Sequence, residues 1–116
     1  MTVNGKAATR VAAPALESVR EGLAAEGLTT EVLRQDDEIA LTATTGQGRA
    51  FHYRLIARDR PRPAMTALDA SERRRAMEWR LTARSDDVAR SRDVTGFTHD
   101  QIVADVLEHL RRWRLG

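Results

Sequence analysis

The fold is decided by residues 38–58, which read EIALTATTGQGRAFHYRLIAR and contain two alternating segments around a glycine-containing turn. Apolar side chains occupy every second position, at Ile39, Leu41 and Ala43 before the turn and at Phe51, Tyr53, Leu55 and Ala57 after it. This period predicts two strands that each bury one face. The turn at residues 45–48 is too short for a crossover connection, so we expect the two strands to be antiparallel neighbours.

Two further strands are predicted on either side of this hairpin. Residues 30–32 indicate a first strand that ends at the Asp36-Asp37 turn, and the alternation resumes in a fourth strand at residues 77–83. Between them, the segment 58–75 breaks the pattern, because its prolines exclude a central strand and a helix interior. Residues 85–96 are polar and carry no predicted element.

A helix is predicted at each end of the chain. The first covers residues 13–26, with Pro14 in its first turn and a stop at Gly27-Leu28. The last begins after Thr98, which forms a capping box with Gln101. Its apolar stripe consists of Ile102, Val103, Val106, Leu107, Leu110 and Trp113. We therefore predict an α+β fold, with an antiparallel sheet of about four strands and both helices on one face.

Length and composition fit one globular domain. Of the 116 residues, we expect residues 1–11 to form a flexible N-terminal arm and residues 12–116 to form a single domain. No cysteine, secretory signal or membrane-length apolar segment is present in the sequence, which favours a cytoplasmic location. The net charge is only +2, so no specific nucleic-acid binding is expected.

No catalytic or metal-binding pattern stands out among the polar residues. The three histidines, His52, His99 and His109, lack the spacing of metal ligands, and we expect them to be exposed. The adjacent acids at 36–38 and 86–87 are typical of turns. Because no nucleophile, base and orienting group can be assigned, we expect no enzyme and no cofactor. Trp79 and Trp113 are interpreted as core residues, with a ligand cage as the alternative.

The arginines that flank the prolines of segment 58–75 are the candidate binding residues. Those singled out for an anionic contact are Arg58, Arg60, Arg62, Arg73 and Arg74. Their guanidinium groups could bind an acidic segment of a protein or anionic lipid headgroups. The alternative is a solvated loop, because acidic residues are interleaved with the arginines.

Three stretches of the chain resemble a known cytoplasmic domain. They are PALE at 14–17 leading into Gly27-Leu28, FHYRL at 51–55 followed by two prolines, and DVTGFTHDQIVADVL at 93–107. Together they resemble the C-terminal extension of high-affinity choline transporters of the betaine/carnitine/choline transporter family. The last of these stretches is the most specific.

The resemblance implies a non-catalytic regulatory domain linked to osmotic control of choline uptake. Its partner would be the transporter membrane domain or another protein, and it would lie in the cytoplasm, at the inner membrane face where it contacts lipid. Family members usually form trimers, so a homo-oligomer is a further possibility. The chain is then either an excised domain or a free-standing relative. The alternative function is a free-standing module that binds a small ligand or anion and shares only the fold.

Overall fold

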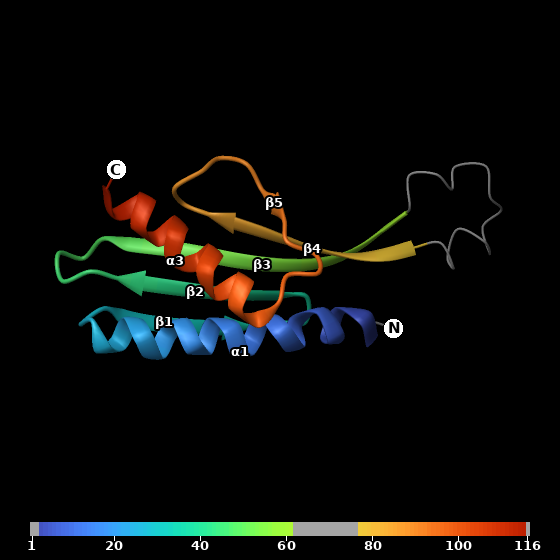
Figure 1. The fold of residues 1–116 in the computed structure, drawn as a ribbon, viewed down its shortest axis with the longest axis horizontal. Helices are drawn as coiled ribbons and strands as arrows, with labels where there is room; N and C mark the ends of the chain where they lie inside the picture. Colours follow the sequence, from blue (N-terminus) through green and yellow to red (C-terminus); the bar gives the residue numbers. More distant parts are fainter. Residues whose placement is uncertain (1–2, 62–76, 116) are drawn as a thin grey trace.

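The protein is a two-layer α+β domain (Figure 1). A computed structural model describes the backbone of residues 3–61 and 77–115 and the side chains of residues 10–58 and 80–115. The elements in chain order are α1 (Val3–Ala25), β1 (Thr29–Arg34), β2 (Glu38–Thr44), β3 (Ala50–Pro61), β4 (Met77–Ser85), β5 (Arg92–Asp93) and α3 (His99–Leu115). The sheet order is β1-β2-β3-β4-β5, and all neighbours are antiparallel. The predicted fold class is confirmed, with five strands in place of about four.

The central hairpin forms as its alternation predicts. Leu41 pairs with Tyr53 and Ala43 with Phe51, so the apolar residues of β2 and β3 share one face. Gly48 closes the turn with a φ of 85°, in the left-handed region that glycine adopts without strain. The register therefore places the polar residues of both strands on the opposite face.

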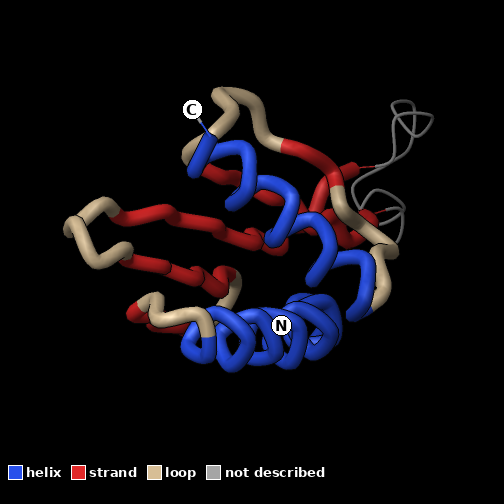
Figure 2. The backbone as a smooth tube through the Cα atoms, turned by 60° about the vertical axis from the view of Figure 1, so that its left-hand side comes forward, coloured by secondary structure: helices blue, strands red, loops and turns tan. Residues whose placement is uncertain are grey.

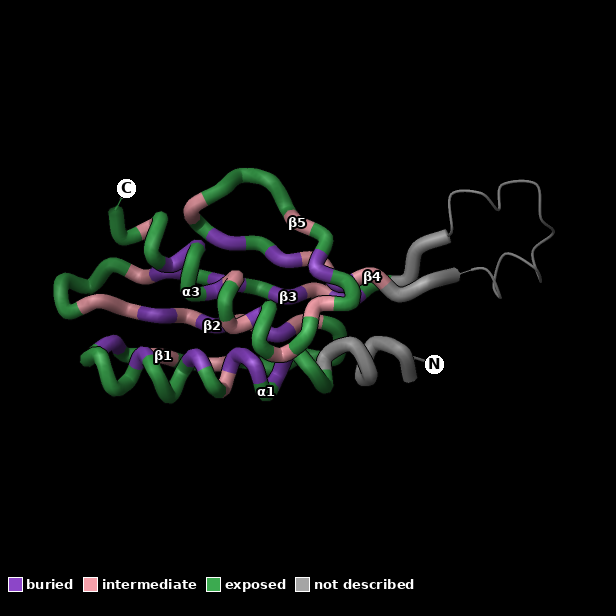
Figure 3. Tube along the Cα trace, viewed as in Figure 1, coloured by how far each residue is buried: buried purple, intermediate pink, exposed green. Residues whose placement is uncertain are grey.

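The core lies between one face of the sheet and the two helices. Buried and more exposed residues alternate along the strands, as Figure 3 shows. The largest fully buried side chains are Tyr53, Phe51, Leu16, Leu23, Leu41, Leu55, Ile102, Val94 and Val106. They come from α1, α3 and the strands, so both helices cover the same face of the sheet (Figure 2).

Helix α1 begins earlier than the sequence pattern predicted. It starts at Val3, ten residues before the predicted start, so residues 3–11 are helical and not the expected arm. Pro14 lies within the helix and is exposed, although proline costs one backbone hydrogen bond there. The alanines around it favour the helix, and Ala12, Ala13 and Ala15 are buried against the core. This burial offsets the proline penalty.

Helix α3 begins with the predicted capping box. The Gln101 backbone N–H donates to Thr98 Oγ1 at 3.2 Å, and the Thr98 N–H donates to Gln101 Oε1 at 2.8 Å. The buried residues of the helix are Ile102, Val106, His109 and Leu110. Leu107, which we predicted on the core stripe, is instead 43% exposed, because it lies about 100° around the helix from Val106. None of the described helices is long and apolar enough to cross a membrane.

Strand β5 was not predicted. Arg92 and Asp93 pair with Ala83 and Thr82, and the next residue, Val94, is buried and donates its N–H to the Leu81 carbonyl at 2.8 Å. Two residues are too short for an alternating pattern. The segment is held beside β4 by the burial of Val94 and by the Leu81 N–H, which donates to Thr95 Oγ1 at 2.8 Å.

Candidate functional site

The face of the sheet opposite the helices is uncovered by any element that the structure describes (Figure 2). Among the described side chains of β3 and β4, four arginines lie on this face and oppose one another in two cross-strand pairs. Arg54 is the partner of Arg84, and Arg58 is the partner of Arg80. Like charges directly opposite each other in a sheet are destabilising. The pairs therefore create a positive surface that an anion would stabilise.

The arginines differ in how their charge is compensated. Arg54 forms an ion pair with Glu38 at 3.4 Å, and Arg80 forms one with Asp93 at 3.5 Å. Arg84 and Arg58 form no ion pair within the described part of the chain. Arg84 is thus an exposed cation beside a second arginine.

Arg84 lies between two hollows on this open face. The larger hollow has a volume of about 560 Å³ and is lined by Leu33, Ala40, Thr42, His52, Arg54, Arg84, Ser85, Asp86, Val88, Ala89 and Arg90. The smaller, of about 100 Å³, is lined by Ile56, Arg58, Thr82, Arg84 and Ser91. A negative group bound at Arg84 would therefore be within reach of arginines from either side.

Only part of the predicted arginine site falls within the described residues. Arg58 is exposed near the end of β3 and lines the smaller hollow. Arg60 belongs to β3, but its side chain lies outside the described residues, as do Arg62, Arg73 and Arg74 entirely. Sequence reasoning missed Arg54 and Arg84 as binding residues. The signal was their position on the polar side of predicted strands, but pairing them required the register of β3 with β4.

The loop between β4 and β5, residues 86–91, is held by a histidine on each face of the sheet. On the open face, Asp86 Oδ2 accepts a hydrogen bond from the His52 backbone N–H at 2.8 Å and lies 2.9 Å from His52 Nδ1. Toward the helices, Asp87 Oδ2 lies 2.6 Å from His109 Nδ1. The Asp86-Asp87 pair, predicted only as a turn former, thus fixes the wall of the larger hollow.

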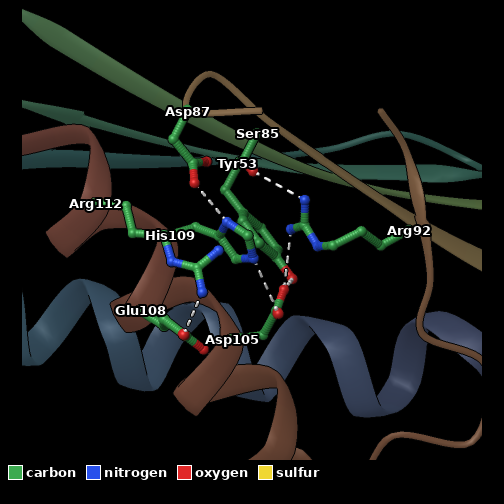
Figure 4. A network of polar contacts seen from close by, with 8 residues as sticks. All are labelled: Tyr53, Ser85, Asp87, Arg92, Asp105, Glu108, His109 and Arg112. Atoms are coloured by element: carbon green, nitrogen blue, oxygen red, sulfur yellow. Dashed lines mark hydrogen bonds and ion pairs between the residues drawn. The ribbon is translucent and has the colours of Figure 1, made fainter. Parts of the chain in front are cut away.

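Asp87 and His109 belong to a buried polar network between α3 and the sheet (Figure 4). His109 Nε2 also lies 3.4 Å from Asp105 Oδ1. Arg92 donates to Asp105 at 3.1 Å and to Ser85 at 3.2 Å. The side chains of His109 and Asp87 are only 6% and 4% exposed, which corrects the prediction of an exposed His109. Both nitrogens of the His109 ring therefore face carboxylates, one from the β4–β5 loop and one from α3.

The network also shifts two pKa values. Burial, followed by the hydrogen bond to Asp105 at 2.6 Å, raises the pKa of Tyr53, because both disfavour the phenolate. Burial alone would raise the pKa of Asp87, but the hydrogen bonds from His109 and Ser85 outweigh it and lower that pKa. Tyr53 is therefore held as a hydrogen-bond donor, and Asp87 as a carboxylate.

A serine, a histidine and an aspartate meet where α1 contacts the start of α3. Ser18 Oγ lies 3.1 Å from His99 Nε2, and His99 Nδ1 lies 3.0 Å from Asp100 Oδ1. Our expectation that no such set exists is therefore wrong on geometry. The sequence does not show the set, because 81 residues separate Ser18 from His99 in the chain. However, Asp100 is 98% exposed, and neither hollow described above includes these residues. Acyl-transfer catalysis relies on a site that excludes water, whereas Asp100 is open to solvent.

Trp113 is half-buried and packs against Phe51, with ring centroids 5.4 Å apart. The guanidinium of Arg49 lies 4.7 Å from the centre of its ring. A cation of the chain itself therefore occupies the position that a quaternary ammonium ligand would take in a cage. The side chain of Trp79 lies outside the described residues.

No known family model matches the chain, and no curated protein matches it. Among the described residues, no group of three or more histidine, aspartate or glutamate side chains could hold a metal ion.

Proposed function

We propose that the chain is a non-catalytic interaction domain that binds an acidic segment of a partner protein through the open face of its sheet. The observation that carries this proposal is the pair formed by Arg54 and Arg84 beside the larger hollow. An arginine can donate two parallel hydrogen bonds to a carboxylate, so the pair offers a fork for the acidic side chains of a partner.

The charges on the whole face favour a ligand that makes a local contact over a ligand with a broad anionic surface. Besides the arginines, the face carries Glu31, Glu38, Asp86 and Asp93, three of which form the ion pairs with Arg54, His52 and Arg80. A flat anionic membrane would meet these acids as well as the arginines. A peptide can place its acidic group at Arg84 and avoid them, so an acidic protein segment is the partner that the charge pattern favours over lipid headgroups.

A regulatory role in choline uptake would follow from the resemblance alone. In that setting the acidic segment would belong to the transporter membrane domain, and the domain would modulate transport under osmotic stress. The alternative, a free-standing anion-binding module, uses the same residues. The two differ in whether the domain binds a transporter's cytoplasmic segments or small anions such as phosphate.

The proposal is tested by titrating a glutamate-rich peptide into the labelled domain and following backbone amide shifts by NMR. Exposed ion pairs contribute about 0.2–1 kcal/mol each, so we expect Arg54→Gln/Arg84→Gln to weaken binding about threefold or more. Arg34→Gln is the matched control, because Arg34 is an exposed arginine of the same sheet whose partner, Ile39, lies on the helix-covered face.

Binding should also weaken as salt is raised, since the contact is exposed. Equal binding by the parent and the double arginine variant at low salt would refute the proposed site. Phosphate binding that competes with the peptide at similar concentrations would favour the small-anion alternative.

A further inference from the structure

The larger hollow has an apolar end and a basic end, arranged along one row of the sheet. The register aligns Leu33 with Ala40, Ala40 with Arg54, and Arg54 with Arg84, across β1, β2, β3 and β4. Leu33 is 55% exposed, and it lines the hollow together with Ala40. The row therefore runs from an exposed apolar patch to the pair of arginines.

The length of this row defines a spacing. Neighbouring strands lie about 4.8 Å apart, so Leu33 is separated from Arg54 by about 10 Å and from Arg84 by about 14 Å along the row. In an extended peptide, side chains four residues apart point to the same side and lie about 13 Å apart. An extended segment that crosses the strands can thus place an apolar side chain on Leu33 and an acidic one at the arginines.

We infer that the ligand is an extended protein segment in which an apolar residue and an acidic residue are four positions apart. This inference rests on the proposed function and specifies the kind of segment that the site takes. The apolar residue packs on Leu33 and Ala40, and the carboxylate binds between Arg54 and Arg84. Val88 and Ala89 of the β4–β5 loop form the wall at the basic end.

Other occupants of the hollow fit the structure less well. A small amphiphilic anion would keep much of its surface in water, because the side chain of Arg54 is 49% exposed and Leu33 is exposed too, whereas small-ligand sites enclose most of their ligand. Bases of nucleic acid would find no phenylalanine, tyrosine or tryptophan among the residues that line the hollow. A peptide covers a longer strip of the face than a small ligand does, and it needs no aromatic side chain for stacking.

The β4–β5 loop, which forms the wall facing such a segment, is held in place by contacts on the helix side of the sheet. Ser85 and Arg92, at the two ends of the loop, are joined at 3.2 Å, and Arg92 and His109 both contact Asp105 of α3. The position of Val88 and Arg90 in the hollow therefore depends on the buried network. The site is a built feature of the fold and not a chance cluster of surface arginines.

The experiment compares two capped peptides of identical composition, each with one leucine and one glutamate in a serine–threonine background. In the first peptide the two residues are four positions apart, and in the second they are three apart, which turns them to opposite sides of an extended chain. NMR titration of the intact domain should give binding at least about fivefold tighter for the first peptide, the change that 1 kcal/mol produces. The amide shifts should include those of Leu33 and Arg84.

Two variants distinguish the spacing of the ligand from the binding of its acidic group. Leu33→Ser should remove the preference for the first peptide and leave weak binding of both, whereas Arg84→Gln should weaken both peptides. If binding depends on Arg84 but both peptides bind equally well to the parent, the spacing inference fails and the proposed function stands. If neither peptide binds in an Arg84-dependent manner, the proposed function fails as well.

A last comparison uses vesicles that contain phosphatidylglycerol. Arg84-dependent co-sedimentation with these vesicles, in the absence of peptide binding, would show that the face takes a membrane surface and would overturn the inference. Each variant is first checked by its NMR spectrum, and both side chains are exposed, so neither change should unfold the domain.

Discussion

Replacement of Asp87 by Asn removes one partner of the most deeply buried ion pair that the structure describes. The exchange keeps the shape of the side chain but leaves His109 without its closest counter-charge, which lies 2.6 Å away. Because the two side chains are 4% and 6% exposed, water cannot replace the lost interaction. Breaking a buried pair in this way costs about 3–5 kcal/mol. That is a large part of the 5–15 kcal/mol by which a domain is usually stable.

The assay is urea denaturation followed by circular dichroism. The matched control is Asp100→Asn, which removes an aspartate 3.0 Å from a histidine at the surface, where the carboxylate is 98% exposed. We expect this control to change stability by less than about 0.5 kcal/mol.

The double variant Asp87→Leu/His109→Leu leaves no charge of this pair buried. Replacing both members of a buried pair by apolar residues is often neutral, so this variant should be more stable than Asp87→Asn. The account of the network would be refuted if Asp87→Asn were no more destabilising than Asp100→Asn.

Three further outcomes are expected. The lowered pKa of Asp87 means that its contribution to stability is present above about pH 4 and is lost as the pH falls through the folded-state pKa. The urea midpoint of Asp87→Asn should therefore depend less on pH between pH 5 and 3 than that of the parent. The raised pKa of Tyr53 means that its contribution is present below about pH 10 and is lost above it, so melting temperatures between pH 9 and 11 should fall more steeply in the parent than in Tyr53→Phe. In denaturant melts, Ile102→Ala should lower the free energy of unfolding by about 2–5 kcal/mol, because Ile102 is fully buried. Thr98→Ala should lower it by about 1 kcal/mol through the lost cap, and Leu107→Ala by less than either. An equal loss for Leu107→Ala and Ile102→Ala would contradict the helix orientation.

The local pattern of the sequence was sufficient for most of the fold. Alternation at residues 38–58 identified the central hairpin, because a strand with one buried face must repeat every two residues. The capping box at Thr98 and Gln101 located the start of α3, because it is built entirely from neighbours in the chain. The start of α1 was missed, because Pro14 is a common first-turn residue and its cost within the helix is offset only by packing that the sequence does not display.

The functional surface and the buried network depended on tertiary structure. The spacing of His109 from Ile102 and Val106 fits the buried stripe of α3, but the sequence does not show what would pair with it there. Its partner Asp87 is 22 residues away on a loop that reaches α3 only in the folded protein. The arginines of β3 and β4 were each visible on the polar side of a strand. That Arg54 opposes Arg84, and that Leu33 completes their row, is fixed by strand register, which places residues from four separate segments side by side. Sequence periodicity determines which face a residue occupies, whereas only the packed sheet determines which residues share that face at contact distance.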